Sequence, residues 1–343
     1  MPGHPFSSIL RSVNRTDSNY RILLLNENEK FQNLLAQTGY DFMVANSKNA
    51  PPWNKMISEI PSNCALLGGN DPAGNLQIDM GIDLIICQSR FNLYNDGTLG
   101  VLARNISAPI ICAEYDFSDP GINPDFKLMV CGYPFNISVF PSNRLANSWS
   151  HDKSMDRVRI VPLGVDTELF SGWVGDKGNI LTMVDFYPQL GNFTGFDMWR
   201  KIAAQKLPVA PLGFSPGFSS KPPMKDKIAA YRSAGVFLNT SSWKSIPIEL
   251  LEAMSVGCPI VTTNTADLPE IIKHDENALV GKDENELRDM CLLLLKDKDR
   301  ARQLGVNARE TILQNYKLEK FVDGWKDIIT STVGKTTAAI TGV

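Results

Sequence analysis

The sequence has few histidines and no closely spaced cysteines. Only three histidines occur in 343 residues, and none of the six cysteines (64, 87, 112, 131, 258 and 291) is part of a CxxC pair. Zinc sites need several such ligands brought together, so we expect no metal site. Several of the cysteines stand in apolar, strand-like runs, which is typical of buried reduced thiols in a cytoplasmic protein.

Long apolar runs and a strong net charge are also missing. No stretch reaches the roughly 18 apolar residues of a membrane span, and the first residues, MPGHPFSS, lack the apolar core of a secretion signal. These absences favour a cytoplasmic location and no membrane span. The formal net charge of −3 disfavours a partner held mainly by electrostatics, such as nucleic acid.

Strands and helices alternate most clearly between residues 235 and 282. An apolar run at 236–239 predicts a buried strand, and helical spacing of apolar residues predicts a helix over 248–255. Gly257 suits the end of that helix, and 258–262 predicts a second strand, followed by a short helix near 268–273. This order is typical of a parallel α/β sheet.

Ligands of parallel sheets bind beyond the carboxyl ends of the strands, where helix N-termini point. Ser245, Ile246 and Pro247 precede the helix predicted at 248–255. A helix N-terminus offers unpaired N–H groups and partial positive charge, which suit a phosphate. Glu252 follows about one turn later, and its carboxylate can accept hydrogen bonds from two neighbouring sugar hydroxyls.

The run SIPIELLEAMSVGCPIVTT, from Ser245 to Thr263, together with the later LPEII, resembles the donor-site signature of GT-B glycosyltransferases of the large retaining family 4. The resemblance implies an α/β fold of two doubly wound, Rossmann-like domains facing each other across a cleft. It also implies that Glu252 binds the ribose of a nucleotide sugar and that residues 245–247 contact its sugar or phosphate. The family's first glutamate falls on Lys244.

The chain departs from this family at the residues that hold the donor diphosphate. By alignment with the family, Val184-Asp185 stands where a Gly-Arg pair is common, and Thr194-Gly195 where Lys-Gly is common. An uncompensated diphosphate in a cleft is costly. Other lysines must therefore supply the positive charge, and the candidates are Lys244 beside the helix mouth and Lys221 and Lys225 in the loop after Gly213. Gly213 is itself a candidate donor-binding residue.

The N-terminal half carries the acceptor in this family. Strands are predicted at 20–26, 82–87 and from 109 onward. Glu114 and Asp116 follow the last of these strands, where the family often has a functional histidine. A carboxylate there can orient an acceptor hydroxyl, so both are candidate catalytic residues. The alternative is that they cap a helix or lie in a solvated loop.

A segment resembling the end of the family's N-terminal domain spans 159–170, and a glycine-rich stretch follows it. We therefore expect an acceptor-side domain over 1–168 and a nucleotide-sugar domain over 169–320. An amphipathic terminal helix begins at 321 and packs back toward the N-terminal domain, and residues 331–343 form a frayed tail.

The resemblance implies metal-independent, retaining transfer of a sugar to an acceptor hydroxyl. The nucleotide sugar, with UDP-sugar as the first expectation, is then a co-substrate, and no other cofactor is needed. The acceptor is a saccharide, a small molecule or a modified base in DNA, as in some viral enzymes of this fold. A third hypothesis is a non-catalytic GT-B scaffold whose donor site has decayed, motivated by the missing arginine, lysine and first glutamate.

Overall fold

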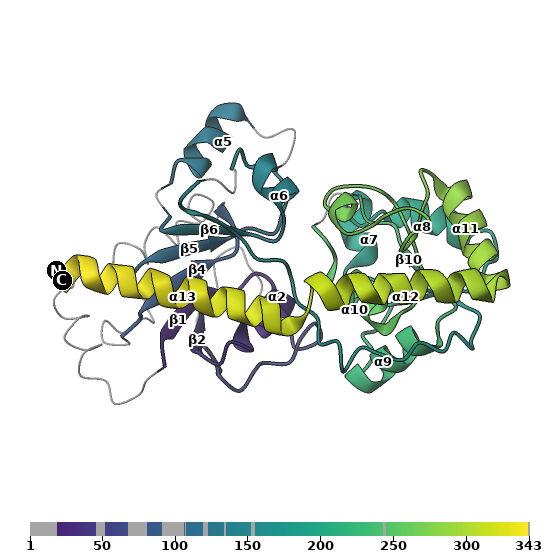
Figure 1. The fold of residues 1–343 in the computed structure, drawn as a ribbon, viewed down its shortest axis with the longest axis horizontal. Coiled ribbons are helices and arrows are strands. Elements are labelled where there is room, and N and C mark those ends of the chain that lie inside the picture. The colour runs from purple at the N-terminus through teal and green to yellow at the C-terminus, as the bar shows by residue number, and fades with distance from the viewer. Residues whose placement is uncertain are drawn as a thin grey trace. The chain divides into compact units, whose positions relative to one another are not determined.

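The computed structural model describes residues 19–45, 52–67, 81–90, 106, 108–118, 123–133, 135–151, 155–242 and 245–341, with side chains up to residue 334. Contacts divide the chain into two compact units (Figure 1). The N-terminal unit contains the chain up to Val161 and returns from Val322 onward, and the C-terminal unit is Pro162–Phe321. Val165 lies in the C-terminal unit, where its N–H donates to Tyr316 O at 2.9 Å.

The described part of the N-terminal unit contains a parallel sheet of seven strands. In chain order these are β1 (Arg21–Leu25), β2 (Asp41–Ala45), β3 (Cys64–Leu66), β4 (Leu84–Cys87), β5 (Ile110–Ala113), β6 (Ile137–Phe140) and β7 (Val158–Ile160). Their order across the sheet is β3-β2-β1-β4-β5-β6-β7. The direction therefore reverses between β1 and β4, which makes the sheet doubly wound. Every residue of β4 and β5 is buried, as in a strand covered on both faces.

Side-chain caps and one long terminal helix complete this unit. Asn28 caps α2 (Glu29–Ala36), Asn123 caps α5 (Pro124–Cys131) and Ser142 caps α6 (Asn143–Ser148), each by accepting a helix N–H. Helix α13 (Leu318–Thr341) enters the unit at Val322 (Figure 1). The Trp325 ring lies 5.8 Å from that of Phe31. The expected frayed tail was wrong up to Thr341, because helix α13 continues that far.

The C-terminal unit is built on a second parallel sheet. Its strands are β8 (Ile180–Met183), β9 (Val209–Leu212), β10 (Val236–Asn239), β11 (Ile260–Thr262) and β12 (Leu279–Val280), in the order β12-β11-β10-β8-β9. The helices are α7 (Tyr187–Leu190), α8 (Phe196–Ala203), α9 (Met224–Ser233), α10 (Ile248–Val256), α11 (Glu284–Lys296) and α12 (Lys298–Asn315).

Right-handed crossovers place these helices on two faces of the second sheet. The chain moves from β8 to β9 in one direction and from β9 through β10 to β11 in the other, so α8 lies opposite α9 and α10. Helix α11 packs against α8, and α10 packs against α9 and α12. The prediction of two doubly wound parallel α/β domains is confirmed. The predicted helix at 268–273 is only a 3-10 turn, Leu268–Glu270, after which the N–H groups of Ile271 and Ile272 both donate to Leu268 O.

Candidate active site

The predicted donor residues lie at the carboxyl edge of β10. Ser245, Ile246 and Pro247 directly precede α10, and Ile246 is 4% exposed. Pro247 O accepts hydrogen bonds from the N–H groups of Leu250 and Leu251, at 3.1 and 3.3 Å, which fixes the first turn of the helix. Lys244, the predicted phosphate partner, lies outside the described residues.

The Glu252 side chain forms buried hydrogen bonds with two residues of helix α9. Lys227 Nζ donates to Glu252 Oε1 at 2.6 Å, and Tyr231 OH donates to Glu252 Oε2 at 2.7 Å. The side chains of Lys227 and Glu252 are only 13% and 7% exposed. Because a carboxylate accepts about four hydrogen bonds, each oxygen of Glu252 keeps capacity for one further donor, such as a ribose hydroxyl.

Aromatic rings surround the Lys227–Glu252 pair. Lys227 Nζ lies 5.7 Å from the centre of the Phe170 ring, within the range of a cation–π contact. Burial, with Glu252 beside it, holds the pKa of Tyr231 well above its usual value, so this phenol remains a hydrogen-bond donor. Sequence analysis did not select Lys227 or Tyr231, although their spacing of four residues places them on one helix face.

Position 213 requires a glycine, because the chain there passes very close to the residue that follows β8. The φ of Gly213 is +115°, and a Cβ there would lie 2.4 Å from Val184 O. Phe214 N–H donates to Asp185 Oδ1 at 2.7 Å, and Ser219 Oγ donates to Gly213 O at 2.8 Å. The glycine therefore lets the loop after β9 fold closely over the end of β8. Lys221, later in this loop, is half-buried, and Lys225 is exposed.

The positions that align with the family's diphosphate-binding cations hold no cation in this chain. Thr194 is 1% exposed and donates from its hydroxyl to Gly191 O at 3.0 Å, so it caps a turn within the protein. Gly195 has φ +70°, and a Cβ there would lie 1.8 Å from Thr240 O. Asp185 stands where an arginine is common in the family, and its side chain accepts a hydrogen bond from the Phe214 N–H.

In the N-terminal unit, Glu114 lies buried at the end of β5. It is 0% exposed, and its Oε2 accepts the Arg90 N–H at 3.1 Å and lies 3.8 Å from Arg90 Nε. The Arg90 guanidinium lies 5.3–5.8 Å from the ring centres of Phe135, Phe140 and Trp149. Burial raises the pKa of Glu114 to about 8, against the opposing effect of Arg90.

Asp116 differs from Glu114 because it is exposed. Its backbone oxygen accepts a hydrogen bond from Trp149 Nε1 at 2.8 Å, which ties the segment after β5 to α6. The structure thus gives the two predicted catalytic carboxylates different environments, one enclosed with an arginine and one in solvent. Their catalytic roles stay predictions, and only Asp116 is accessible to an acceptor as the unit stands.

A family match covers the donor segment. The family described as Glycosyl transferases group 1 matches residues 217–311. N-acetyl-alpha-D-glucosaminyl L-malate synthase from Bacillus anthracis is 32% identical over 95 residues, which are 27% of this chain and 25% of that protein. A trehalose synthase from Pyrococcus horikoshii is 26% identical over 106 residues, 31% of this chain and 26% of that one. The matched segment thus spans about a quarter of these relatives' length.

Solved structures share the fold over nearly the whole chain. Sucrose-phosphate synthase from Thermosynechococcus elongatus superposes with a TM-score of 0.71 at 15% identity, over 91% of this chain and 99% of that one. Anabaena HepE in complex with UDP-glucose gives 0.71 at 13% identity, with the same coverage. Residues 217–311 are therefore a glycosyl transferases group 1 segment, in a chain that has the fold of GT-B glycosyltransferases.

Proposed function

We propose that the protein transfers a sugar from a nucleotide-sugar donor to an acceptor hydroxyl. Glu252 carries this proposal. It lies inside the family-matched segment, at the family's ribose position, and its carboxylate is buried at a site that retains unused acceptor capacity. Lys227 and Tyr231 hold the carboxylate in one orientation, so that ribose hydroxyls meet a fixed pair of acceptors.

We extend the proposal to the donor, the mechanism and the acceptor. The donor is a UDP-sugar, in keeping with the HepE structure, which contains UDP-glucose. The transfer retains the anomeric configuration and uses no metal, with Ser245–Pro247 contacting the donor and Lys244 and Lys221 offsetting the diphosphate charge. Glu114 and Asp116 are the candidate acceptor-side residues, and the acceptor is a saccharide or small molecule.

Calorimetric titration with UDP, UDP-glucose, GDP-mannose and ADP-glucose tests the donor site. We expect Glu252→Gln to weaken binding of the best nucleotide by about 1–3 kcal/mol, the range for hydrogen bonds to a charged group. Glu310→Gln, at an exposed glutamate of α12, is the matched control and should leave binding unchanged. A folded Glu252→Gln protein with unchanged affinity would remove Glu252 from the site.

A non-catalytic scaffold is the second candidate. Two observations favour it. Asp185 and Thr194 stand where the family has diphosphate-binding cations, and both make hydrogen bonds within the protein. Glu252 is likewise already hydrogen-bonded to Lys227. At saturating ligand a donor-binding enzyme should gain roughly 3 kcal/mol of stability. If none of the nucleotides shifts the melting temperature, the scaffold is the better account.

A further inference from the structure

Helix α10, which carries Glu252, ends against the segment that opens the C-terminal unit. The last four carbonyl groups of an α-helix have no partner within the helix. Two of these groups in α10 accept hydrogen bonds from distant parts of the chain. Trp173 N–H donates to Val256 O at 3.1 Å, and the guanidinium of Arg309 on α12 donates to Ser255 O. The end of the helix is therefore fixed by the tertiary structure.

The guanidinium of Arg309 also holds the segment that opens the unit. Nη1 donates to Phe170 O at 3.1 Å, and Nη2 donates to Thr167 O at 3.1 Å. Ser255 Oγ donates to the same Phe170 O at 2.8 Å. An arginine presents its N–H donors in a rigid, planar fork. One side chain thus fixes the backbone of Phe170 relative to the end of α10.

The ring of Phe170 packs on the two residues that hold the Glu252 carboxylate. Phe170 is 5% exposed, and its ring centre lies 6.1 Å from that of Tyr231 in an edge-on arrangement. The ammonium group of Lys227 lies 5.7 Å from the centre of the same ring. Tyr231 and Lys227 each donate to one oxygen of Glu252. A displacement of Phe170 would therefore release the packing that keeps both donors in place.

Arg309 is thus connected to the Glu252 carboxylate by two short routes. The first is α10 itself, because Ser255 follows Glu252 by three residues, which is less than one helical turn. The second is the Phe170 ring. A side chain that sets both the helix and the ring can hold a carboxylate within the narrow range of orientations that ligand hydroxyls require.

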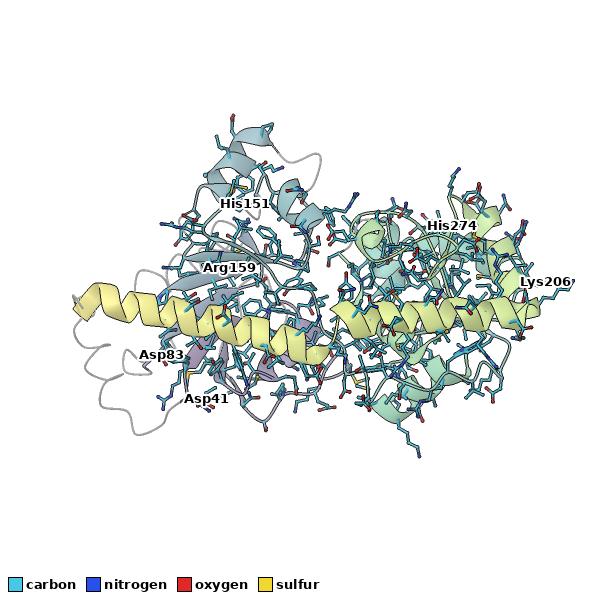
Figure 2. The ribbon with its side chains drawn as sticks, viewed as in Figure 1. Asp41, Asp83, His151, Arg159, Lys206 and His274 are labelled. Atoms are coloured by element: carbon cyan, nitrogen blue, oxygen red, sulfur yellow. The ribbon has the colours of Figure 1, made fainter. Side chains whose placement is uncertain are left out.

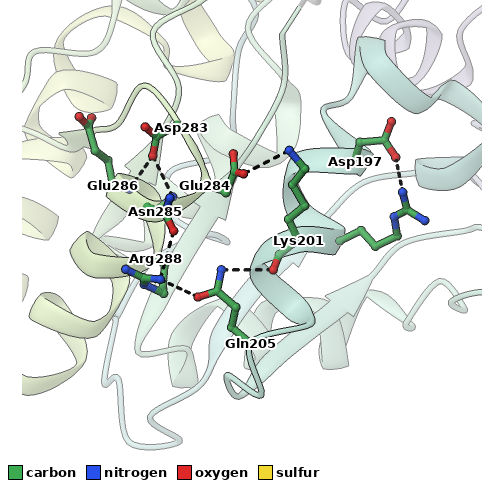
Figure 3. A network of polar contacts seen from close by, with 9 residues as sticks. Asp197, Lys201, Gln205, Asp283, Glu284, Asn285, Glu286 and Arg288 are labelled. Atoms are coloured by element: carbon green, nitrogen blue, oxygen red, sulfur yellow. Dashed lines mark hydrogen bonds and ion pairs between the residues drawn. The ribbon is translucent and has the colours of Figure 1, made fainter.

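Arg288 of α11 also makes three hydrogen bonds through its guanidinium, but to surface side chains. Nη1 donates to Gln205 Oε1 at 2.8 Å and to Asn285 Oδ1 at 3.2 Å (Figure 3), and Nε donates to Asp289 Oδ1 at 2.7 Å. All three partners are exposed residues. Arg288 is therefore a matched control for Arg309, with a similar set of hydrogen bonds that joins α11 to the residues after α8 and not to α10.

We propose that Arg309 is a positioning residue of the donor site. By holding the end of α10 and the Phe170 ring, it sets the orientation in which the Glu252 carboxylate meets the ribose. The effect on nucleotide affinity rests on the proposed function, whereas the placement of Phe170 is a property of the protein without ligand. A cation near a helix C-terminus also stabilises the helix, and a lysine at position 309 keeps that contribution while it loses the fork.

The first measurement follows Lys227 by NMR in the unliganded chain, produced with isotope-labelled lysine. The ring of Phe170 displaces the signals of the Lys227 ε-methylene group, and Phe170→Leu gives their position without the ring. In Arg309→Lys these signals should move at least half of the way to that position. The signals of the exposed Lys206, marked in Figure 2, should stay where they are, and so should those of Lys227 in Arg288→Lys.

The second measurement is calorimetric titration with UDP, GDP and ADP. Arg309→Lys should weaken binding of the best of them tenfold or more, and Arg288→Lys should leave it unchanged. The proposal is overturned if Arg309→Lys folds with the Lys227 signals of the wild type, or if those signals move and the affinity does not. If the wild type binds none of the nucleotides, the proposed function fails, and the Lys227 signals alone then support or overturn the positioning by Arg309.

Ser255→Ala covers the case in which Arg309→Lys does not fold. It removes only the Oγ donor to Phe170 O, and alanine is a good helix former. The Lys227 signals should move in the same direction by a smaller amount, and unchanged signals in this variant contradict the proposal. Circular dichroism establishes the folding of each variant.

Discussion

At the residue scale, the Lys227–Glu252–Tyr231 contact explains why an acidic side chain is stable inside the C-terminal unit. An isolated buried carboxylate is costly, but two donors, one of them the Lys227 cation, compensate it here. The same contact limits what the residue can do. A ligand adds to the existing partners of Glu252 and does not replace them, because removing a partner leaves a buried charge uncompensated.

Tyr231→Phe should therefore destabilise the C-terminal unit by about 1.5–3 kcal/mol, because Glu252 Oε2 loses its donor. Hydrogen exchange of the α9 and α10 amides measures the loss. Tyr316→Phe is the matched control, since no hydrogen bond of its hydroxyl is found among the described residues, and it should change little. Equal effects of the two substitutions would mean that the Tyr231 hydroxyl contributes nothing specific.

The raised pKa of Glu114 predicts that the stability of the N-terminal unit depends on pH. This pKa is raised from 4.5 to about 8 by burial, so the folded unit binds a proton more tightly than the unfolded chain. This stabilisation is complete below pH 4.5 and is lost as the pH rises through 8, with a slope of at most about 1.4 kcal/mol per pH unit. Glu114→Gln should flatten that part of the stability profile in chemical denaturation, and an unchanged slope would contradict the assignment.

At the scale of elements, glycines decide how closely loops approach the ends of the second sheet. Gly195 and Gly217 both have positive φ, +70° and +74°. A Cβ at Gly195 would overlap Thr240 O at 1.8 Å, whereas one at Gly217 meets nothing within 4 Å. Their substitutions separate a steric clash from a backbone preference.

Gly195→Ala should displace the start of α8 and lower the stability of the C-terminal unit by several kcal/mol or prevent its folding. Gly217→Ala should cost only about 1 kcal/mol, the penalty of the left-handed conformation. Thermal unfolding of the two variants, side by side, measures the difference. Similar melting temperatures would show that the approach of Gly195 to Thr240 is not needed.

At the scale of the whole molecule, the chain returns to its first unit through α13. Trp325 is 0% exposed and lies against Phe31 of α2. Trp325→Ala should cost about 3–5 kcal/mol of the stability of the N-terminal unit. Hydrogen exchange read separately on the two units is the right measurement, because one free energy does not describe a two-unit protein. Loss of protection should appear in β1, β2 and α2, and equal loss in β8 and β10 would contradict this assignment.

Much of the fold was predictable because its signals are local. The apolar runs at 236–239 and 258–262 and the helical spacing between them all became the expected elements. Helix α8 and strand β9 were not predicted. The first begins at a glycine cap with no side-chain hydrogen bond, and the second is a half-buried edge strand containing Pro211.

The sequence by itself determined the alternation of strands and helices and the segment that matches the family, because both depend on residues close together in the chain. Only the tertiary structure decided that Lys227 meets Glu252 and that Glu114 is enclosed with Arg90. The physical reason is that these contacts join residues more than twenty positions apart. The burial of these side chains and the direction of their hydrogen bonds set their chemistry, and both are fixed only once the strands have paired.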